Sequence, residues 1–141
     1  MHCSRLAPLL LLTLAAANAP ATVQIDIQGA RNARGVFHVC VTGQQRHFPD
    51  CSKDPTAVKR TVLAASRSLS LPGLVPGRYA VTLIHDENNN QRLDTLLGIP
   101  REGFGFSRNP VVRFGAPSFR QVDIQLAPGI NRQALRLQYL L

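Results

Sequence analysis

The stretch GLVPGRYAVTLIHD, residues 73–86, decides the fold of this chain. Pro76 and Gly77 predict a tight turn, and the residues after them alternate between two faces, as they do in a β-strand. One face begins at Tyr79 and the other at Ala80, and both are largely apolar. Apolar residues on both faces are typical of a central strand in a sheet that is covered on both sides.

The same period of two extends over most of the chain on either side of this strand. The segments that predict further strands are TVQIDIQG (22–29), GVFHVCVTG (35–43), SLSLPG (68–73), PVVRF (110–114), FRQVDIQLAPG (119–129) and QALRLQYLL (133–141). Between residues 54 and 68 two interpretations stay open, a short helix after Pro55 or a β segment around residues 61–64. About seven short strands without sustained helical periodicity predict an all-β, two-sheet sandwich of the transthyretin-like or immunoglobulin-like kind, with one long ordered loop.

The N-terminal stretch MHCSRLAPLLLLTLAAANAPA, residues 1–21, has the pattern of a secretory signal peptide. Its apolar core is shorter than the about 20 residues that a membrane-spanning helix needs. We expect cleavage after Ala17 or Ala21, and less readily after Ala19. Residues 22–141 are then expected to form a single β-sandwich domain without a transmembrane segment, located in the periplasm or secreted.

The chain is basic, with 16 Lys and Arg against 8 Asp and Glu and a formal net charge of +8. The arginines are scattered along the sequence, and the chain has no tryptophan to stack on nucleic-acid bases. We therefore expect no specific nucleic-acid binding and mainly solvated surface charge. Attraction to anionic lipid or to polyanionic glycans is the alternative. The sequence indicates no particular partner.

Cys40 and Cys51 are the two cysteines that remain once the signal peptide is removed. In an oxidising compartment, two cysteines separated by a short turn-rich segment predict a disulfide. A zinc site that includes the nearby His38 and His47 is the less favoured alternative, because a structural zinc site needs four ligands.

The stretch HDENNNQRLDTLLGIPREGFGFS, residues 85–107, follows the central strand and carries most of the candidate site residues. Counting from Asp86, oxygen donors fall in the ligand order of a calcium loop. The candidate ligands are Asp86, Asn88, Asn90, the backbone carbonyl of Arg92, and Asp94. Gln91 replaces the central glycine and Leu97 the final glutamate, so only a weak Ca²⁺ site is expected. The alternative is a metal-free loop, because Asn and Asp side chains bond to nearby backbone amides.

The same stretch contains a candidate acid–base set formed by His85, Asp86 and Glu102. Adjacent residues on a strand point to opposite faces, so the side chains of His85 and Asp86 should diverge. We therefore expect His85 to anchor the loop by a hydrogen bond rather than to act as a catalyst.

The segment Gly103, Phe104, Gly105 and Phe106 alternates between bare backbone and aromatic rings. The favoured interpretation is that the two rings pack over the sandwich and that the glycines let another chain segment pass close by. The alternative is that the rings form a shelf for a ligand.

Taken together, residues 73–107 resemble the signature of the bacterial exported family called domain of unknown function 2141. In that family a turn-and-tyrosine strand leads into a His-Asp pair, an asparagine-rich loop, a Leu-Asp pair, a Gly-Ile/Met-Pro step and an aromatic-glycine segment. The matching residues are His85, Asp86, Asn88, Asn90, Leu93, Asp94, Gly98, Pro100, Glu102, Gly103, Phe104, Gly105, Phe106 and Ser107. The chain departs at Gln91, where the family commonly has glycine, so the turn must form without that glycine.

The resemblance implies an exported β-sandwich related to the transthyretin-like and carboxypeptidase-regulatory-like domains, and it implies no enzyme activity. We therefore expect a non-enzymatic accessory or binding domain of the cell envelope. The alternatives are a small exported hydrolase that uses His85 and the acids of the loop, and a purely structural envelope module.

Overall fold

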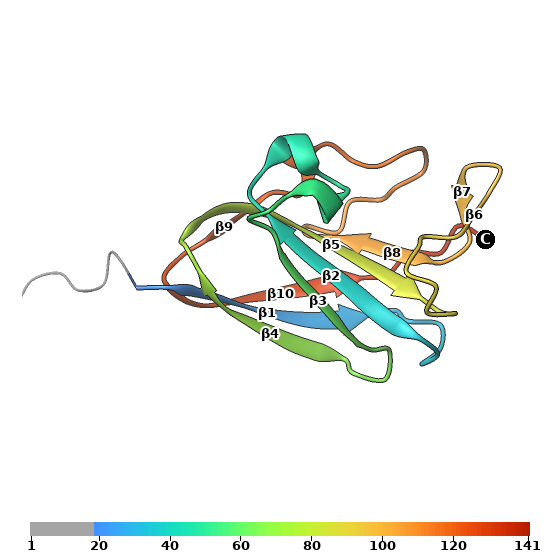
Figure 1. Cartoon of the computed structure of the whole chain (residues 1–141), viewed down its shortest axis with the longest axis horizontal. Coiled ribbons are helices and arrows are strands. Elements are labelled where there is room, and N and C mark those ends of the chain that lie inside the picture. Colours follow the sequence, from blue (N-terminus) through green and yellow to red (C-terminus); the bar gives the residue numbers. More distant parts are fainter. Residues whose placement is uncertain (1–18) are drawn as a thin grey trace, which may run out of the picture.

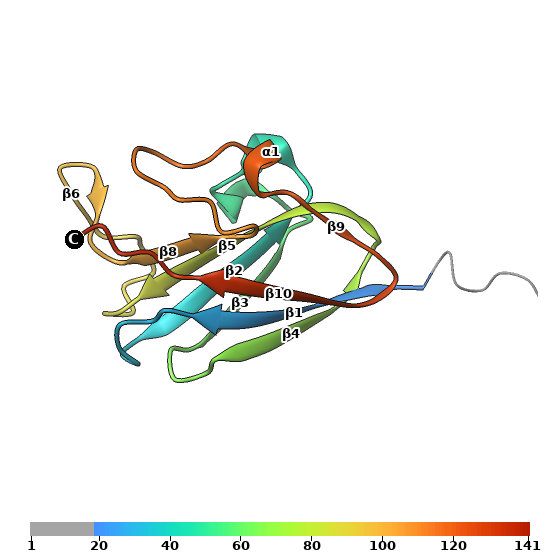
Figure 2. The ribbon, with the colours of Figure 1, turned by 180° about the vertical axis from the view of Figure 1, so that it is seen from behind.

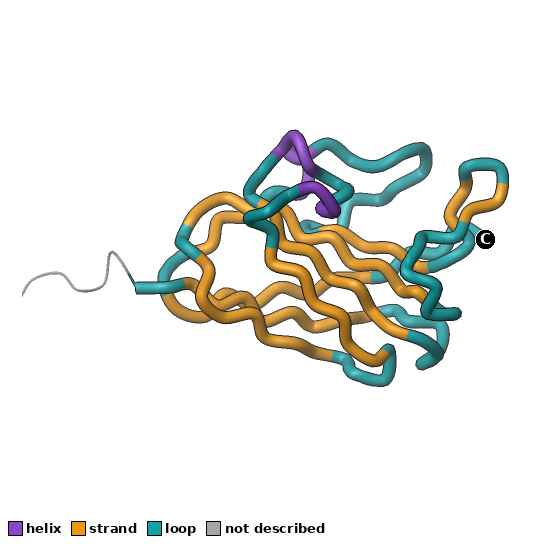
Figure 3. The backbone as a smooth tube through the Cα atoms, in the orientation of Figure 1, coloured by secondary structure: helices purple, strands orange, loops and turns teal. Residues whose placement is uncertain are grey.

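The computed structural model describes residues 19–141, which form two β-sheets packed face to face (Figure 1, Figure 2). The nearly all-β content and the sandwich arrangement confirm the fold class predicted from the sequence (Figure 3). The predicted signal peptide falls mostly on residues 1–18, which lie outside the described residues. Within residues 19–141, no helix is long and apolar enough to cross a membrane.

The first sheet contains three strands in the order β10, β1, β4. Their bounds are β1 (Ala21–Gln28), β4 (Ser68–Leu74) and β10 (Gly129–Arg136). β1 runs parallel to β10 and antiparallel to β4, so segments from the two ends of the described chain lie side by side. Val23, Ile25 and Ile27 alternate with more exposed residues along β1 and are buried in the core between the sheets.

The second sheet has the strand order β3, β2, β5, β8. Its strands are β2 (Val36–Thr42), β3 (Val58–Leu63), β5 (Gly77–Asp86) and β8 (Gly103–Phe106), and β9 (Ile124–Leu126) pairs with the start of β5. The remaining elements are the 3₁₀-helices η2 (Gln45–His47) and η3 (Cys51–Lys53), the hairpin strands β6 (Thr95–Leu96) and β7 (Ile99–Pro100), and the short α-helix α1 (Phe119–Val122).

β5 is the central strand predicted from residues 73–86, because it pairs with β2 on one side and with β8 on the other. Val81 and Leu83 on its inner face are fully buried against the first sheet. Ala80 and Thr82 on its outer face are also buried. β5 is therefore covered on both of its faces, as the apolar residues on both faces predict for a central strand.

The sequence prediction of a strand over residues 110–114 is wrong. These residues form part of an exposed loop, and the amide of Val112 donates to the side chain of Gln138 instead of to a neighbouring strand. The backbone of Phe104 in β8 exchanges two hydrogen bonds with Gln138. The edge of β8 opposite β5 is therefore paired with the C-terminal segment, so it offers no hydrogen-bond partner to Pro110 and its neighbours.

The predicted strand over residues 119–129 is only partly right, because its first four residues form α1. The amide of Ser118 donates to Gln121 Oε1, which caps the helical turn, and Phe119 and Val122 are both buried on its inner side. Between residues 54 and 68 the β alternative is correct, because β3 occupies Val58–Leu63.

The predicted disulfide between Cys40 on β2 and Cys51 on η3 is confirmed. Beside it, the buried carboxylate of Asp54 accepts a hydrogen bond of 2.5 Å from Thr42 Oγ1, and both the amide and the hydroxyl of Thr56 donate to its other oxygen. The hydrogen bond from Thr42 is the largest influence on the Asp54 carboxyl, and its pKa falls from the ordinary 3.8 to about 2. The disulfide and Asp54 together fix residues 44–57 over one end of β2.

Candidate functional site

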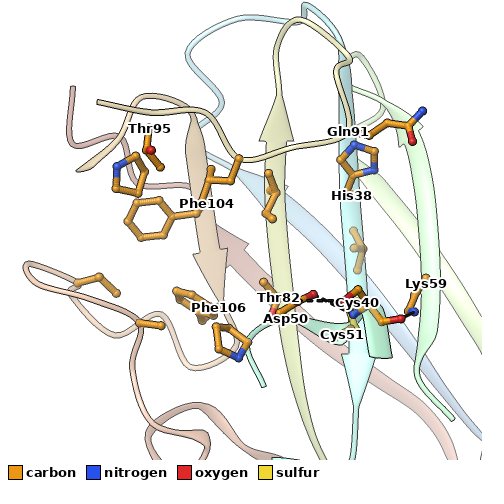
Figure 4. Close-up of a pocket in the computed structure, with 18 of the residues that line it drawn as sticks. His38, Cys40, Asp50, Cys51, Lys59, Thr82, Gln91, Thr95, Phe104 and Phe106 are labelled. Atoms are coloured by element: carbon orange, nitrogen blue, oxygen red, sulfur yellow. Dashed lines mark hydrogen bonds between the residues drawn. A yellow bond between two sulfur atoms is a disulfide. The ribbon is translucent and has the colours of Figure 1, made fainter. Parts of the chain in front are cut away.

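The outer face of the second sheet is the candidate functional site, because it carries an open groove of about 1070 Å³ (Figure 4). Its floor includes the outer-face residues Cys40, Thr82 and Ile84 of β2 and β5. Its walls come from the β5–β8 loop (residues 87–102) and from the β8–α1 loop (residues 107–118). Ligand sites in proteins span about 300–1,000 Å³, so the groove is large enough for a small organic molecule.

Most of the groove lining is apolar. The aromatic rings of Phe104 and Phe106 flank the floor. Leu93, Pro100 and Val112, which belong to the loops above the floor, line the walls of the groove. Phe104 and Phe106 also pack with α1 in a second apolar cluster on this outer face. They are only 4% and 5% exposed, which confirms the prediction that the two rings pack over the sandwich. They nevertheless contribute to the groove.

The glycines between these rings let the C-terminal segment approach, as the sequence predicted. A Cβ atom on Gly103 would lie 2.5 Å from the ring of Tyr139, and one on Gly105 would lie 2.8 Å from the carbonyl oxygen of Arg136. Neither distance leaves room for a side chain. The C-terminal segment can therefore cross the inner side of β8 only where glycine is present.

Thr82 is the one buried polar side chain in the described residues whose hydrogen-bonding group has no partner. Its side chain is 6% exposed and lies on the floor of the groove, between Cys40 and Phe106 (Figure 4). A buried hydroxyl without a partner costs about 1–3 kcal/mol. The oxygen itself is covered by neighbouring atoms, so a molecule in the groove reaches it only if the threonine side chain rotates.

One end of the groove contains a chain of polar side chains that the sequence did not reveal. Nε2 of His38 donates to Asp86 Oδ2 at 2.9 Å, and Nδ1 lies 2.8 Å from Thr61 Oγ1. Burial raises the pKa of the Asp86 carboxyl, but hydrogen bonds from His38 and from the Gln91 and Asn90 amides lower it by more. The pKa of Asp86 therefore lies below its ordinary value, and its negative charge faces the His38 ring.

The structure places His85 on the other side of β5, as expected from strand alternation. His85 is fully buried, its Nε2 donates to the Arg34 carbonyl at 2.8 Å, and its Nδ1 lies 2.8 Å from the Tyr139 hydroxyl. His85 therefore joins the β1–β2 turn to the C-terminal segment. The prediction that His85 anchors the following loop by a hydrogen bond is therefore wrong, because both ring nitrogens are directed to Arg34 and Tyr139 inside the sandwich.

The candidate calcium ligands lie in a loop with many hydrogen bonds of its own. The two carboxylate oxygens of Asp86 accept from the amides of Asn90 (3.0 Å) and Gln91 (2.7 Å). The side-chain amides of Asn88 and Asn90 each donate to one oxygen of Asp94, at 2.7 and 2.8 Å. The Asn88, Asn90 and Asp94 side chains are thus brought together, whereas Asp86 bonds separately to backbone.

Further hydrogen bonds hold the two ends of this loop. Asn90 Oδ1 accepts from the amide of Arg92, whose carbonyl was the remaining candidate ligand. Glu102 accepts from the amides of Glu87 and Asp94, one on each carboxylate oxygen. Within residues 19–141, no group of three or more His, Cys, Asp or Glu side chains is placed to hold a metal ion. This pattern matches the metal-free alternative, and the weak calcium site stays a prediction.

Arg31 forms a second anchor for the loop, which the sequence gave no reason to single out. Its guanidinium bonds to Glu87 at 2.6 Å, stacks 4.5 Å from the centre of the Tyr139 ring, and reaches the carbonyls of Arg101 and Leu141. Burial raises the pKa of Glu87, and hydrogen bonds from Arg31 and its neighbour Asn32 lower it below the ordinary value. These contacts tie the loop to the C-terminus.

Strand register explains why the pairing of His38 with Asp86 escaped prediction. His38 and Asp86 stand on neighbouring strands, where Val36 pairs with Asp86 and His38 pairs with Ile84. They meet diagonally on one face, which only the pairing of β2 with β5 reveals. Period-two alternation could place both on outer faces, but it could not place them side by side.

The fold and the site define a class of protein, an all-β two-sheet sandwich with a disulfide and an apolar groove on one outer face. Residues 25–133 match the family described as "uncharacterized protein conserved in bacteria", domain of unknown function 2141. The chain belongs to this family, which confirms the resemblance seen in residues 73–107. No curated protein and no solved structure matches the chain.

Proposed function

We propose that this protein is an exported, non-enzymatic binding domain of the bacterial cell envelope, and that its ligand lies in the outer-face groove. The observation that carries the proposal is the unpartnered Thr82 hydroxyl on the floor of an otherwise mainly apolar groove. This combination favours a mainly apolar organic molecule, and rotation of the Thr82 side chain would bring its hydroxyl within reach of a polar group of that molecule. A few placed polar groups within an apolar lining are typical of small-molecule sites.

Export is proposed on two grounds. The N-terminal stretch has the pattern of a signal peptide, and the disulfide between Cys40 and Cys51 suits an oxidising compartment. Location can be tested by expressing the full chain in a bacterium and assaying the periplasmic, secreted and cytoplasmic fractions. A protein retained in the cytoplasm with its N-terminal stretch uncleaved would contradict export.

Binding can be tested with 1-anilinonaphthalene-8-sulfonate, a fluorescent probe with an apolar ring system, a secondary amine and an anionic sulfonate. We expect saturable binding to the wild-type protein and at least about tenfold weaker binding to Ile84→Trp, because the larger side chain fills the groove floor. Thr82→Val, which removes the hydroxyl and keeps the shape, should weaken binding less. Thr22→Val, a matched change on β1 in the other sheet, serves as the control.

The outcome is decisive for the groove in either direction. Equal affinity of wild type and Ile84→Trp, with both proteins folded by circular dichroism, would show that the probe binds elsewhere. Selective loss in Ile84→Trp and Thr82→Val would support the groove. Competition with compounds that differ only in their polar group then identifies the chemistry that Thr82 selects.

Hydrolysis is a second candidate function, favoured by the hydrogen-bonded chain of Asp86, His38 and Thr61 at the end of the groove. His85, named in the sequence-based alternative, is fully buried inside the sandwich, whereas His38 lines the groove, so His38 is the better candidate base. Short-chain p-nitrophenyl esters provide the test. Turnover by wild type that disappears in His38→Ala would favour a hydrolase over a binding domain.

A further inference from the structure

Exposed apolar side chains gather around the mouth of the groove. Leu97 is 94% exposed at the tip of the β6–β7 hairpin, and Phe114 is 96% exposed in the β8–α1 loop. The hairpin and this loop rise on the same side of the second sheet, and the C-terminus lies beside the hairpin (Figure 1, Figure 2). Within residues 19–141, seven of the ten large hydrophobic residues that are exposed belong to these segments. We call them the apolar rim: Leu96, Leu97, Ile99, Val111, Phe114, Leu140 and Leu141.

The apolar rim and the groove are continuous. Thr95, Gly98 and Pro100 of the hairpin line the groove, and so do Val112 and Gly115 of the β8–α1 loop. The rim residues are therefore the sequence neighbours of groove residues. Single exposed apolar side chains are ordinary, but a group around a groove marks an interaction surface.

The same loops carry three arginines without an ion-pair partner among the described residues. Arg92, Arg101 and Arg113 are exposed, and within residues 19–141 none of the three forms an ion pair with a carboxylate. Of the acids of the β5–β8 loop, Glu87 pairs with Arg31 and Arg34, whereas Asp94 and Glu102 keep their negative charge and direct their oxygens to amide donors of the loop.

The rest of the surface offers little negative charge to offset these arginines. Six of the eight acidic residues are buried or half-buried, and only Asp26 and Asp50 are exposed. Exposed apolar tips flanked by unpaired arginines are suited to a surface that is negatively charged outside and apolar beneath. An anionic lipid bilayer has this chemistry.

We infer that the apolar rim docks on an anionic lipid bilayer. Leu97 and Phe114 insert at the level of the first acyl carbons, and Arg92, Arg101 and Arg113 lie among the lipid phosphates. Docking in this orientation turns the mouth of the groove toward the bilayer. The inference goes beyond the proposed function and does not depend on which molecule occupies the groove.

The test uses the full chain, expressed with its N-terminal stretch and purified after export, and vesicles of known composition. Co-flotation is measured with phosphatidylethanolamine–phosphatidylglycerol vesicles and with pure phosphatidylcholine vesicles. We expect binding to the anionic vesicles only, weakened by high salt because exposed charges are screened. The double variant Leu97→Ser, Phe114→Ser should reduce partitioning at least about tenfold.

Val75→Ser with Ile130→Ser provides the matched control. These residues are 74% and 63% exposed but lie near the start of β5 and the start of β10, away from the hairpin. The control variant should float like wild type. Equal losses in both double variants, or no binding of wild type to anionic vesicles, would overturn the inference.

A second copy of the chain is the competing occupant of the apolar rim. Light scattering after size exclusion distinguishes it, because a dimer that dissociates in Leu97→Ser, Phe114→Ser would assign the rim to self-association and refute docking on lipid. The groove proposal is tested separately, since Ile84→Trp changes the groove floor and not the rim. Vesicle binding can therefore fail while probe binding persists.

Discussion

Replacing Asp86 by Asn tests whether the β5–β8 loop is held by its own hydrogen bonds or by a cation. The Asp86 side chain is fully buried, and its oxygens accept from His38 (2.9 Å), Asn90 (3.0 Å) and Gln91 (2.7 Å). An asparagine keeps one oxygen and places an amide group where the other stood. At least one of the three donors then loses its acceptor.

The magnitude follows from these contacts. A hydrogen bond to a charged group contributes about 1.5–3 kcal/mol, and a buried donor left unpaired costs about 1–3 kcal/mol. The two contributions overlap, so we expect Asp86→Asn to lower the free energy of unfolding by about 2–4 kcal/mol. Domains of this size lose roughly 3–5 °C of melting temperature per kcal/mol. The melting temperature should therefore fall by roughly 12 °C, near the middle of the range that these two figures give.

The assay is thermal unfolding followed by circular dichroism, once with EDTA and once with about 5 mM CaCl₂, above the Kd of many weak extracellular sites. If the loop is self-bonded, Asp86→Asn loses the same stability in both buffers. Asp94→Asn is the control, because its carboxylate bonds to the exposed side chains of Asn88 and Asn90 and should cost less than about 1 kcal/mol.

A calcium-dependent result would refute the self-bonded account. Calcium would then raise the melting temperature of wild type by mass action, and both Asp86→Asn and Asp94→Asn would remove that rise. Loss of stability seen only with calcium present would identify Asp86 as a ligand. Isothermal titration of wild type with CaCl₂ would show the corresponding heat.

Three further predictions concern stability. In urea denaturation, Gly35→Ala should lower the free energy of unfolding by at least about 3 kcal/mol, because φ is +70° and the new Cβ would lie 2.0 Å from the carbonyl oxygen of Asp86. Gly73→Ala is the control: its φ is +81° but the new Cβ would meet open space, so the free energy of unfolding should fall by only about 1–2 kcal/mol. Since the pKa of Asp54 is lowered to about 2, its contribution to the free energy of unfolding is complete above about pH 4 and is lost as the pH falls toward 2. Asp54→Asn should therefore flatten the plot of unfolding free energy against pH in this range. Replacing Cys40 and Cys51 together by Ser should cost about 2–3 kcal/mol, and a reductant should then have no further effect.

The parts of the fold that sequence predicted are those set by local alternation. β5 was predicted as a central strand because its apolar residues occupy both faces, and the disulfide because Cys40 and Cys51 flank a short segment. The error at residues 110–114 has the opposite origin. Whether that segment becomes a strand depends on a free sheet edge, and the backbone of Gln138 already occupies the edge of β8.

The groove could not be predicted for the same reason. It exists because the β8–α1 loop stands away from the sheet, whereas a strand at residues 110–114 would have lain in a sheet. The unpartnered Thr82 hydroxyl likewise has meaning only once its surroundings are known. Sequence alternation placed Thr82 on the outer face of β5, but nothing in its local sequence distinguishes it from a threonine bonded to a neighbour.

The structural and binding interpretations of the β5–β8 loop apply to different parts of it. Its base is held by the buried carboxylates of Asp86 and Glu102, each of which accepts two backbone amides. Within the described chain, residues 95–100 at its tip take part in no side-chain hydrogen bond, and Leu97 is almost fully exposed. A rigid base that presents an apolar tip is what an interaction surface requires, because little conformational entropy is then lost on binding. Substitutions at the base should therefore lower the melting temperature, whereas Leu97→Ser should leave it unchanged and alter only binding.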